Sequence, residues 1–488
     1  MIADELIRLF AQEFHHDFTR GQALAAAGLA RFLSASSSDA AFILRGYAGT
    51  GKTTLVAALV RVLRKLGREV VLLAPTGRAA KVFSRLAGEP AYTVHKVIYR
   101  QQSFQGEGTR FSLGFNRLRN ALFIVDEASM IPLDAGSQLF GSGLLLDDLV
   151  RFVYQGEGCR LLLVGDIAQL PPVGQAESPA LNASVISIYG LRVHEADLTE
   201  VVRQHEDSGV LAGATRLRGL LTEGFCGLPR IVGSPSGEVR FLPGDELIEA
   251  LVSAYGECGT SDTIVITRSN QRANVYNNGI RSRIFDREEQ LTRGDLVMAV
   301  KNNYFWTEQA ARHLSQGERL PFDFIANGDA ARVVRIRNVH ELYGFHFADA
   351  VLCFPDYGDY ELECRVLLDT LGSASPSLTA EESRRLYEQV LLDYAHIPSR
   401  RERMKQLRQD PYYNALQLKY AYAVTCHKAQ GGQWSRVFVD QGYLPPEALG
   451  PSYLRWLYTA FTRATGVLYL VNWPKAQQEE PAASAVAD

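Results

Sequence analysis

The sequence predicts an α/β fold built on two parallel β-sheets, with a β-hairpin inserted in the first sheet domain and a small β-barrel inserted in the second. Short, continuously apolar segments alternate with helical stretches in the first third of the chain, and a second such set recurs near the C-terminus. Apolar strands separated by helices are typical of a parallel sheet covered on both faces. A different pattern, with alternating and β-branched residues, interrupts the second set and favours a barrel.

Length and composition limit the class of protein. The chain has 488 residues, of which 47% are apolar and 22% charged, so two or more domains are expected. No run of 18 apolar residues is present, and the N-terminus up to His16 lacks the basic and apolar regions of a secretory signal. The sequence therefore predicts a cytoplasmic protein without a membrane partner.

The cysteine spacing argues against two kinds of metal site, and the net charge limits where a phosphate-binding surface can lie. The six cysteines form no Cys-x-x-Cys pair, which argues against zinc or iron–sulfur sites and favours buried free thiols in a reducing compartment. The net charge is −3, so a surface that binds phosphate groups must be a local groove.

Four apolar segments, each followed by a polar or glycine-rich turn, predict the first sheet. They are Ala41–Arg45, Glu69–Leu73, Ala121–Val125 and Arg160–Val164. In a parallel sheet, ligands bind at the carboxyl ends of the strands. We therefore expect the turns that follow these strands to build a site.

The second sheet is predicted from four further segments, separated by barrel strands. The sheet segments are Thr263–Thr267, Tyr420–Val424, Arg436–Asp440 and Val467–Val471. The barrel segments are Gly294–Val300, Gly328–Ile336, Ala348–Phe354 and Tyr360–Leu368. Four or five short strands with little helix between them predict a small barrel inserted into the second sheet domain.

Three remaining segments complete the predicted organisation. Lys96–Asn116 is polar, with glycines at its centre and aromatic residues on both arms, and predicts a projecting β-hairpin. Ser373–Asp410 is charged and helical, and the tail from Lys475 has the composition of a disordered segment. The expected division is 1–96 and 119–190 for the first sheet domain, 97–118 for the hairpin, 191–292 and 413–475 for the second sheet domain, 293–372 for the barrel, 373–412 for the helical insert and 476–488 for a disordered tail.

Residues 46–53 read Gly-Tyr-Ala-Gly-Thr-Gly-Lys-Thr and match the P-loop pattern G-x-x-x-x-G-K-[ST] between a strand and a helix. The glycines let backbone N–H groups turn toward phosphate oxygens, Lys52 adds a cation and the Thr53 hydroxyl suits Mg²⁺. The segment predicts a site for ATP and Mg²⁺. Its expected nucleotide contacts are Gly46, Gly49, Thr50, Gly51, Lys52, Thr53 and Thr54.

Two adjacent carboxylates, Asp126 and Glu127, end an apolar strand about 74 residues after the P-loop lysine. Asp126 is expected to hold Mg²⁺ through water, and Glu127 to act as the general base that orients the attacking water. A solvated acidic loop is the alternative. Phosphoryl transfer depends on positioning and charge, which these residues can supply.

The other motifs follow one another in the order found in the superfamily 1 helicases. The matching segments are Gln22, Gly46–Thr53, Ala74–Ala80, Thr93–His95, Asp126–Ser129, Gly165–Val173, Leu198–Gln204, Thr267–Asn270, Val424–Gly432 and Tyr458–Ala464. The chain resembles the class B group, which includes RecD-type and Dda-type DNA helicases, from about Phe18 to Val471. Single motifs of this kind are weak, whereas ten in the right order are a strong match.

This resemblance implies two RecA-like domains with ATP between them, and a Src-homology-3-like identity for the barrel. It implies that Gln22 reads adenine, for which core or surface capping is the alternative, and that Gln169 senses the γ-phosphate. Arg203 and Arg463 would be arginine fingers that close onto ATP from the second domain, with surface arginines on helices as the alternative. Many members carry an aromatic residue before the first finger, but this chain has Val202 there.

The resemblance also implies contacts to a nucleic-acid strand. They are Pro75, Thr76, Thr93, His95, Thr425, His427 and Lys428. Hydroxyls, amides and cations suit phosphate contacts that do not read sequence, although either histidine could be structural. The hairpin aromatics could split a duplex or pack on their own hairpin. The basic residues between Arg400 and Arg408 could guide a strand or form a solvated helix face.

The expected function is that of an ATP-dependent DNA helicase that translocates on single-stranded DNA, 5′ to 3′ by analogy, and unwinds duplex. Its expected partners are single-stranded DNA and duplex junctions, with recombination, repair or replication proteins as further candidates. One alternative is a helicase that remodels RNA or ribonucleoprotein. The other is a motor subunit of a recombination or repair nuclease complex.

Overall fold

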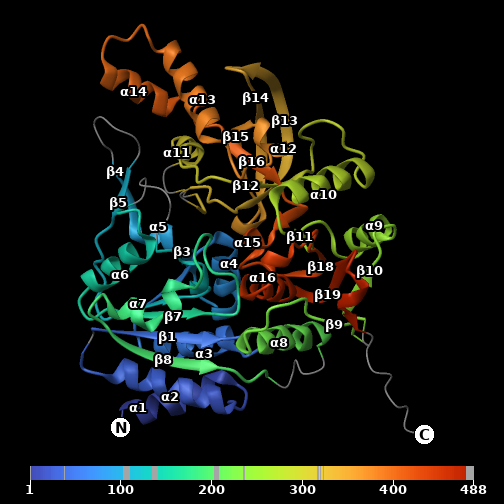
Figure 1. Ribbon diagram of the computed structural model, residues 1–488. Helices are drawn as coiled ribbons and strands as arrows, with labels where there is room; N and C mark the ends of the chain where they lie inside the picture. Colours follow the sequence, from blue (N-terminus) through green and yellow to red (C-terminus); the bar gives the residue numbers. More distant parts are fainter. Residues whose placement is uncertain are drawn as a thin grey trace.

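The computed structural model describes residues 2–37, 39–102, 110–133, 141–202, 208–234, 237–315, 318, 320–322 and 324–479. Two parallel sheets lie side by side, and a β-barrel and a pair of helices extend from the second (Figure 1). The predicted α/β class with parallel sheets is confirmed.

The first sheet has six parallel strands in the order β3-β2-β6-β7-β1-β8. The strands are β1 (Ala40–Gly46), β2 (Val70–Ala74), β3 (Ala91–Thr93), β6 (Leu122–Val125), β7 (Arg160–Gly165) and β8 (Arg192–Leu198). The helices are α1 (Ile2–Phe14), α2 (Arg20–Ser34), α3 (Lys52–Lys65), α4 (Gly77–Ala87), α5 (Val94–Ile98), α6 (Leu145–Gln155) and α7 (Ala183–Ser187). Short 3-10 helices are η1 (Ala128–Met130) and η2 (Pro179–Leu181).

Strand β1 shows why the sheet is covered on both faces. Phe42 and Leu44 belong to the core that contains α1, α2 and α3 residues, whereas Ala41 and Ile43 belong to the core that contains α5 and α6 residues. Because successive side chains of a strand point to opposite faces, a continuously apolar strand fills two cores. The expected boundary between residues 190 and 191 is wrong, because β8 pairs in parallel with β1 and extends the first sheet to Leu198.

The second sheet has five parallel strands in the order β10-β19-β18-β11-β17. The strands are β10 (Val239–Leu242), β11 (Thr263–Thr267), β17 (Ala423–Thr425), β18 (Trp434–Asp440) and β19 (Ala464–Val471). The helices are α8 (Gly209–Thr222), α9 (Leu247–Cys258), α10 (Asn270–Arg283), α15 (Cys426–Ala429) and α16 (Pro451–Phe461), with the 3-10 helix η5 (Pro446–Ala448).

A closed five-stranded barrel interrupts the second sheet domain. Its strands are β12 (Leu296–Ala299), β13 (Ala330–Leu342), β14 (Phe345–Phe354), β15 (Tyr360–Leu367) and β16 (Leu416–Tyr420), with α11 (Phe305–Ala311) and η4 (Pro355–Tyr357) in its connections. The expected barrel boundary at residue 372 is wrong, because β16 pairs with both β12 and β15 and closes the barrel. The expected single strand 420–424 is divided between β16 and β17.

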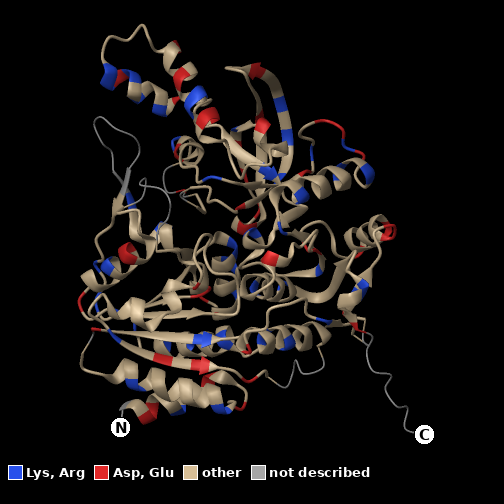
Figure 2. Ribbon diagram, in the orientation of Figure 1, with Lys and Arg blue, Asp and Glu red and all other residues tan. Residues whose placement is uncertain are grey.

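The insert between β15 and β16 is helical, as expected. It contains α12 (Asp369–Gly372), α13 (Ala380–Asp393) and α14 (Arg400–Gln409). Figure 2 shows α13 and α14 at the far end of the molecule from the first sheet, with charges of both signs. The basic residues of α14 therefore lie on a mixed surface, where Lys405 pairs with Glu402.

The predicted hairpin is present as β4 (Tyr99–Gln102) paired with β5 (Arg110–Leu113) in antiparallel register. Its tip, including Phe104, lies outside the described residues. Phe115, at the base of the second arm, is exposed.

Two expectations are corrected in the C-terminal region and among the thiols. Residues 476–479 are not disordered, because η6 (Lys475–Gln477) and β20 (Gln478–Glu479) dock on β9 (Ile231–Val232) and Gln477 is fully buried against Gln441. Residues 480–488 lie outside the described part. Cys226 is exposed and Cys258 is only partly buried, so the expectation of buried thiols is wrong for these two. Within the described ranges, no helix is both long and apolar enough to cross a membrane.

A buried carboxylate ties the barrel to the second sheet domain. Asp295, which precedes β12, is fully buried and accepts hydrogen bonds from Arg281 of α10, from Arg287 and from the Tyr422 hydroxyl. Its ion pairs with the two arginines measure 3.0 Å and 2.9 Å. Removing the carboxylate would leave these guanidinium groups without their counter-charge.

We therefore expect Asp295→Ala to lower the free energy of unfolding by about 3–5 kcal/mol, the usual cost of breaking a buried ion pair. Glu363→Ala is the control, because it removes a carboxylate whose partner, Arg337, lies with it on the barrel surface, and such pairs contribute at most about 1 kcal/mol. Urea unfolding followed by circular dichroism measures both. Equal midpoints for the two variants would contradict the prediction.

Candidate nucleotide and strand-binding site

The P-loop joins β1 to α3 at the carboxyl edge of the first sheet. Gly49 and Gly51 have left-handed backbone angles, with φ of 75° and 77°, which glycine adopts without strain. A Cβ atom at Gly46 would lie 2.7 Å from Cγ of Lys52, so a side chain there would displace the lysine. The loop therefore has room for little besides backbone, as a phosphate cradle requires.

The reactive side chains of the loop are held close to it. The Lys52 ammonium and the Thr50 hydroxyl both donate to the Tyr47 carbonyl, each at 2.8 Å. Thr54 is exposed on the first turn of α3. Lys52 thus lies folded over the loop, with its charge at the place where phosphate oxygens would enter.

Two carboxylates follow β6, the strand two places from β1 in the sheet. The Thr53 hydroxyl donates to Asp126 Oδ2 at 3.5 Å, which brings together two of the predicted residues. Burial, reinforced by the charge of Glu127, raises the pKa of Asp126 above its ordinary value. Glu127 has φ of 52°, a left-handed conformation that costs a non-glycine residue free energy and is common at active sites.

Gln169 follows β7, the neighbour of β1, and is buried. Its side-chain oxygen Oε1 has no hydrogen-bond partner among the described residues. Buried polar atoms are almost always satisfied, so this atom is a candidate for a ligand or water contact.

Both the oxygen and the nitrogen of the Gln22 side-chain amide form hydrogen bonds within the protein. Its oxygen accepts from the Thr19 N–H at 3.0 Å as part of the capping box of α2, and its nitrogen donates to the Thr50 carbonyl at 3.0 Å. The structure thus gives Gln22 a capping role that also braces the P-loop. Its role as adenine reader stays a prediction.

Of the two predicted arginine fingers, Arg463 lies within the described residues. Arg203 lies outside the described residues. Arg463 is buried and donates to the Thr459 carbonyl, the Gly432 carbonyl and the Thr462 hydroxyl, at 3.0, 3.1 and 3.0 Å. Its guanidinium is therefore held by the second domain in this structure, and its role as a finger stays a prediction. Val202 contacts the P-loop by donating its N–H to the Gly49 carbonyl at 3.0 Å.

The predicted strand contacts of the first domain lie in two helix caps. Thr76 caps α4 by accepting from the Ala79 N–H at 3.2 Å, and Thr93 caps α5 by accepting from the Lys96 N–H at 3.3 Å. Pro75, before the first cap, is partly buried. Burial lowers the pKa of His95 to about 4, so this imidazole is neutral at physiological pH.

The contacts predicted for the second domain follow β17. Thr425, His427 and Lys428 are partly buried around the short helix α15, and burial lowers the pKa of both the imidazole and the ammonium. A Cβ atom at Gly431 would lie 3.1 Å from Cβ of Ala79 and 3.2 Å from Oγ1 of Thr76. The predicted strand-binding turns of the two domains therefore meet.

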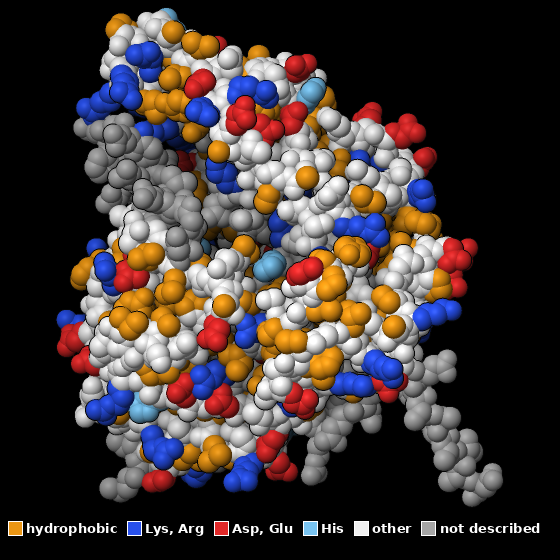
Figure 3. All heavy atoms as spheres, in the orientation of Figure 1, with side chains coloured by type: hydrophobic (Ala, Val, Ile, Leu, Met, Phe, Trp, Pro, Cys, Tyr) orange, Lys and Arg blue, Asp and Glu red, His pale blue; other side chains and the backbone are white. Residues whose placement is uncertain are grey.

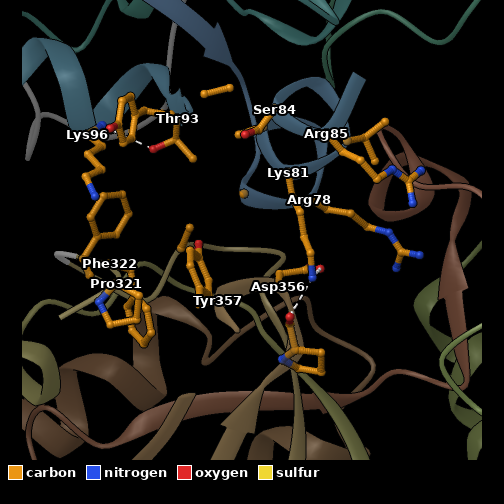
Figure 4. A pocket seen from close by; sticks show the side chains of 18 of the residues that line it. Arg78, Lys81, Ser84, Arg85, Thr93, Lys96, Pro321, Phe322, Asp356 and Tyr357 are labelled. Carbon is orange, nitrogen blue, oxygen red and sulfur yellow. Dashed lines mark hydrogen bonds and ion pairs between the residues drawn. The ribbon is translucent and has the colours of Figure 1, made fainter. Parts of the chain in front are cut away.

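Beside this junction lies a cavity of about 830 Å³, bounded by α4, the β3–α5 turn and the barrel (Figure 4). Cationic and aromatic side chains share its wall: Arg78, Lys81, Arg85, Lys96, Tyr92, Phe322, Phe324 and Tyr357. Lys81 bridges to the barrel through the Pro355 carbonyl at 2.6 Å and the Asp356 carboxylate at 3.5 Å. Figure 3 shows no single-sign field over the visible surface, so this basic lining is a local feature.

Four further residues of the matched motifs, not predicted as site residues, contact the ATP site from the second domain or beside it. They are Asp166, Gln430, Tyr458 and Thr459. All four lie within matched motifs, so the sequence could have indicated that they belong to the site. Their partners could not be named, because the contacts join segments about 260 to 410 residues apart.

Comparison with known families assigns a match to each half of the chain. Residues 19–219 match the family described as "AAA domain", and residues 420–471 match the "UvrD-like helicase C-terminal domain". The first match covers all strands of the first sheet, and the second covers β17, β18 and β19 of the second sheet.

Relatives match parts of the chain. The ATP-dependent RecD2 DNA helicase of Deinococcus radiodurans is 39% identical over 135 residues, which are 27% of this chain and 16% of that protein. The ATP-dependent DNA helicase dda of Enterobacteria phage T4 is 26% identical over 265 residues, 52% of this chain and 55% of that protein. A solved structure of Pif1 helicases at forked double-stranded DNA aligns with 95% of this chain and 94% of its own, at 16% identity and a TM-score of 0.47.

The matched part of this chain thus spans between about one sixth and one half of these two curated relatives. The family matches fall on the two sheets that carry the ordered motif series. In these matched parts the chain is similar to RecD-like and Dda-like DNA helicases, in agreement with the resemblance to the class B helicases of superfamily 1.

Proposed function

We propose that this chain is an ATP-dependent DNA helicase that translocates on single-stranded DNA and unwinds duplex. The observation that carries the proposal is the junction of the two sheet domains. The P-loop lies at the carboxyl edge of one sheet, and the predicted strand-binding turns of both domains meet where Gly431 approaches Thr76. A change of domain spacing driven by the nucleotide would therefore alter the contacts that both domains make with a strand.

The chemistry proposed is attack of water on the γ-phosphorus of ATP, with cleavage of its bond to the β–γ bridging oxygen. Glu127 would orient the water and accept its proton, and Lys52 with the loop amides would stabilise the charge on the phosphate oxygens. The Thr53 hydroxyl and the Asp126 carboxylate are oxygen donors of the kind that Mg²⁺ prefers. When bound, Mg²⁺ neutralises charge on the β- and γ-phosphate oxygens.

The proposed strand path crosses the two caps and the basic cavity. Cations facing a strand neutralise phosphates, and exposed rings offer stacking surfaces to any base. Tyr92 is 41% exposed at the cavity wall, and its ring lies 5.1 Å from the Lys96 ammonium. We take the barrel that forms the opposite wall as the Src-homology-3-like domain of this helicase group.

One prediction of the proposed function concerns hydrolysis. Lys52→Ala removes the cation over the P-loop and Glu127→Gln removes the proposed base, so both variants should lose ATP hydrolysis by at least about 10²-fold. Phosphate release at saturating ATP measures this loss. The Glu127→Gln variant should still bind ATP, as measured with a fluorescent nucleotide. Hydrolysis within tenfold of the wild type would contradict these assignments.

A second prediction concerns the cavity. Arg85→Ala should weaken binding of single-stranded DNA and lower the slope of log affinity against log salt by about 0.7, the value for one lost phosphate contact. The control is Arg31→Ala, which removes an exposed cation from α2, a helix that packs on β8 at the opposite edge of the first sheet from β3. Fluorescence anisotropy over a salt series gives both slopes. Identical slopes for the two variants would remove Arg85 from the path.

Direction is the third prediction. By analogy with class B helicases, displacement should require a 5′ single-stranded tail and fail with a 3′ tail. Strand displacement on the two substrates at low salt measures it, because low salt preserves weak phosphate contacts. Efficient displacement from the 3′ tail alone would reverse the direction and leave the ATPase proposal standing. RNA tails on the same duplex test the alternative substrate.

A further inference from the structure

A tyrosine of the second domain is hydrogen-bonded to two parts of the ATP site at once. Tyr458 lies on α16, which Figure 1 shows between the two sheets. Its hydroxyl accepts from the P-loop N–H of Ala48 at 2.8 Å and donates to Asp166 Oδ2 at 2.7 Å. Both Tyr458 and Asp166 are buried, with 2% and 0% of their surface exposed.

Two neighbouring contacts fix the same segment of the first domain. The Leu170 N–H donates to the Thr459 hydroxyl at 2.9 Å, and the Leu170 carbonyl accepts from the Gln430 side chain at 2.7 Å. Segment 166–170, which includes the buried Gln169, is therefore held by three side chains of the second domain. Gln430 lies next to Gly431, the residue that approaches Thr76.

The Tyr458 hydroxyl is suited to hydrogen-bond Ala48 and Asp166 at the same time. Burial, reinforced by the Asp166 charge, raises the pKa of Tyr458 well above its ordinary value, so the hydroxyl keeps the proton that it donates. A hydroxyl has one donor and two acceptor positions, which matches one carboxylate and one N–H. The bond to a charged acceptor in a buried setting is stronger than one between neutral groups.

We propose that Tyr458 is a positioning residue that transmits the state of the ATP site to the second domain, through its bonds to Ala48 and Asp166. Rearrangement of the P-loop moves the Ala48 N–H. A change around Gln169 moves Asp166, which lies three residues before it in the sequence. Either displacement acts on α16 directly. From there it reaches the strand-binding turn at Thr425–Lys428 through α15, which packs on α16. This inference rests on the proposed function.

The test compares Tyr458→Phe with Tyr453→Phe. Both substitutions remove one hydroxyl from a buried tyrosine of α16, but Tyr453 donates to Gln441 within the second domain, at 2.6 Å. Hydrogen exchange of the nucleotide-free chain should become faster in peptides covering 46–51 and 166–171 for Tyr458→Phe alone. Unchanged exchange in these peptides would show that the tyrosine does not hold them.

The second measurement separates transmission from binding. For Tyr458→Phe, the ratio of strand-stimulated to strand-free kcat should fall about tenfold, the effect of losing a hydrogen bond to a charged group. The affinity for a non-hydrolysable ATP analogue should change less than threefold, since the phosphate cradle remains. Tyr453→Phe should keep the wild-type ratio. A lost affinity with an intact ratio would assign Tyr458 to nucleotide binding and overturn the proposal.

Failure of this inference and failure of the proposed function can be told apart. If no strand stimulates the wild type, the helicase proposal fails, and the exchange experiment still decides whether Tyr458 holds the P-loop. If Tyr458→Phe lowers the melting temperature too far, Asp166→Asn weakens the same bond by neutralising its acceptor. It should shift both readouts in the same direction, and a wild-type ratio in that variant would count against the proposal.

Discussion

The contact between the carboxyl edge of the first sheet and the segment from Gln430 to Arg463 is the constraint on which the rest of the structure depends. A P-loop alone can bind a nucleotide, but it does mechanical work only when a second body responds. Here that body approaches through buried hydrogen bonds, including those of Tyr458 and Thr459. Such bonds are directional and lose most of their strength when stretched. A small displacement of either sheet therefore strains the hydrogen bonds that join it to the other.

Local sequence patterns predicted the features that depend on local physics. The P-loop needs glycine at positions with positive φ, such as Gly51, and a helix that begins at Lys52, so pattern and conformation coincide. The inner strands of both sheets, such as β1, β7, β11 and β18, could be recognised because burial on two faces demands continuous apolar runs. The hairpin followed from its turn composition. The roles given to Gln22, Gln169, Arg203 and Arg463 depend on a bound nucleotide and stay predictions.

Features that depend on distant pairing could not be predicted. Strand β8 reads as an alternating segment because it lies at the edge of the first sheet, where its side chains Arg192 and Glu195 are exposed. Of strand β16 only Tyr420 was predicted, merged with β17, because Gln417 and Lys419 interrupt its apolar residues and only two residues separate the two strands. The order of the tail depends on Gln477, a polar residue whose partners lie far back in the chain. Composition alone assigns such a residue to solvent.

The closure of the barrel by β16 has a mechanical consequence. Strands β15 and β16 pair in parallel, so the chain must cross over between them, and the helices α13 and α14 occupy that crossover. After β16, Ala421 and Tyr422 lead directly into β17, and Tyr422 donates to Asp295 at the barrel entrance. No long loop separates the last barrel strand from Thr425. Tension applied to the barrel by a duplex or a bound protein would therefore reach the proposed strand-binding turn through only two linking residues.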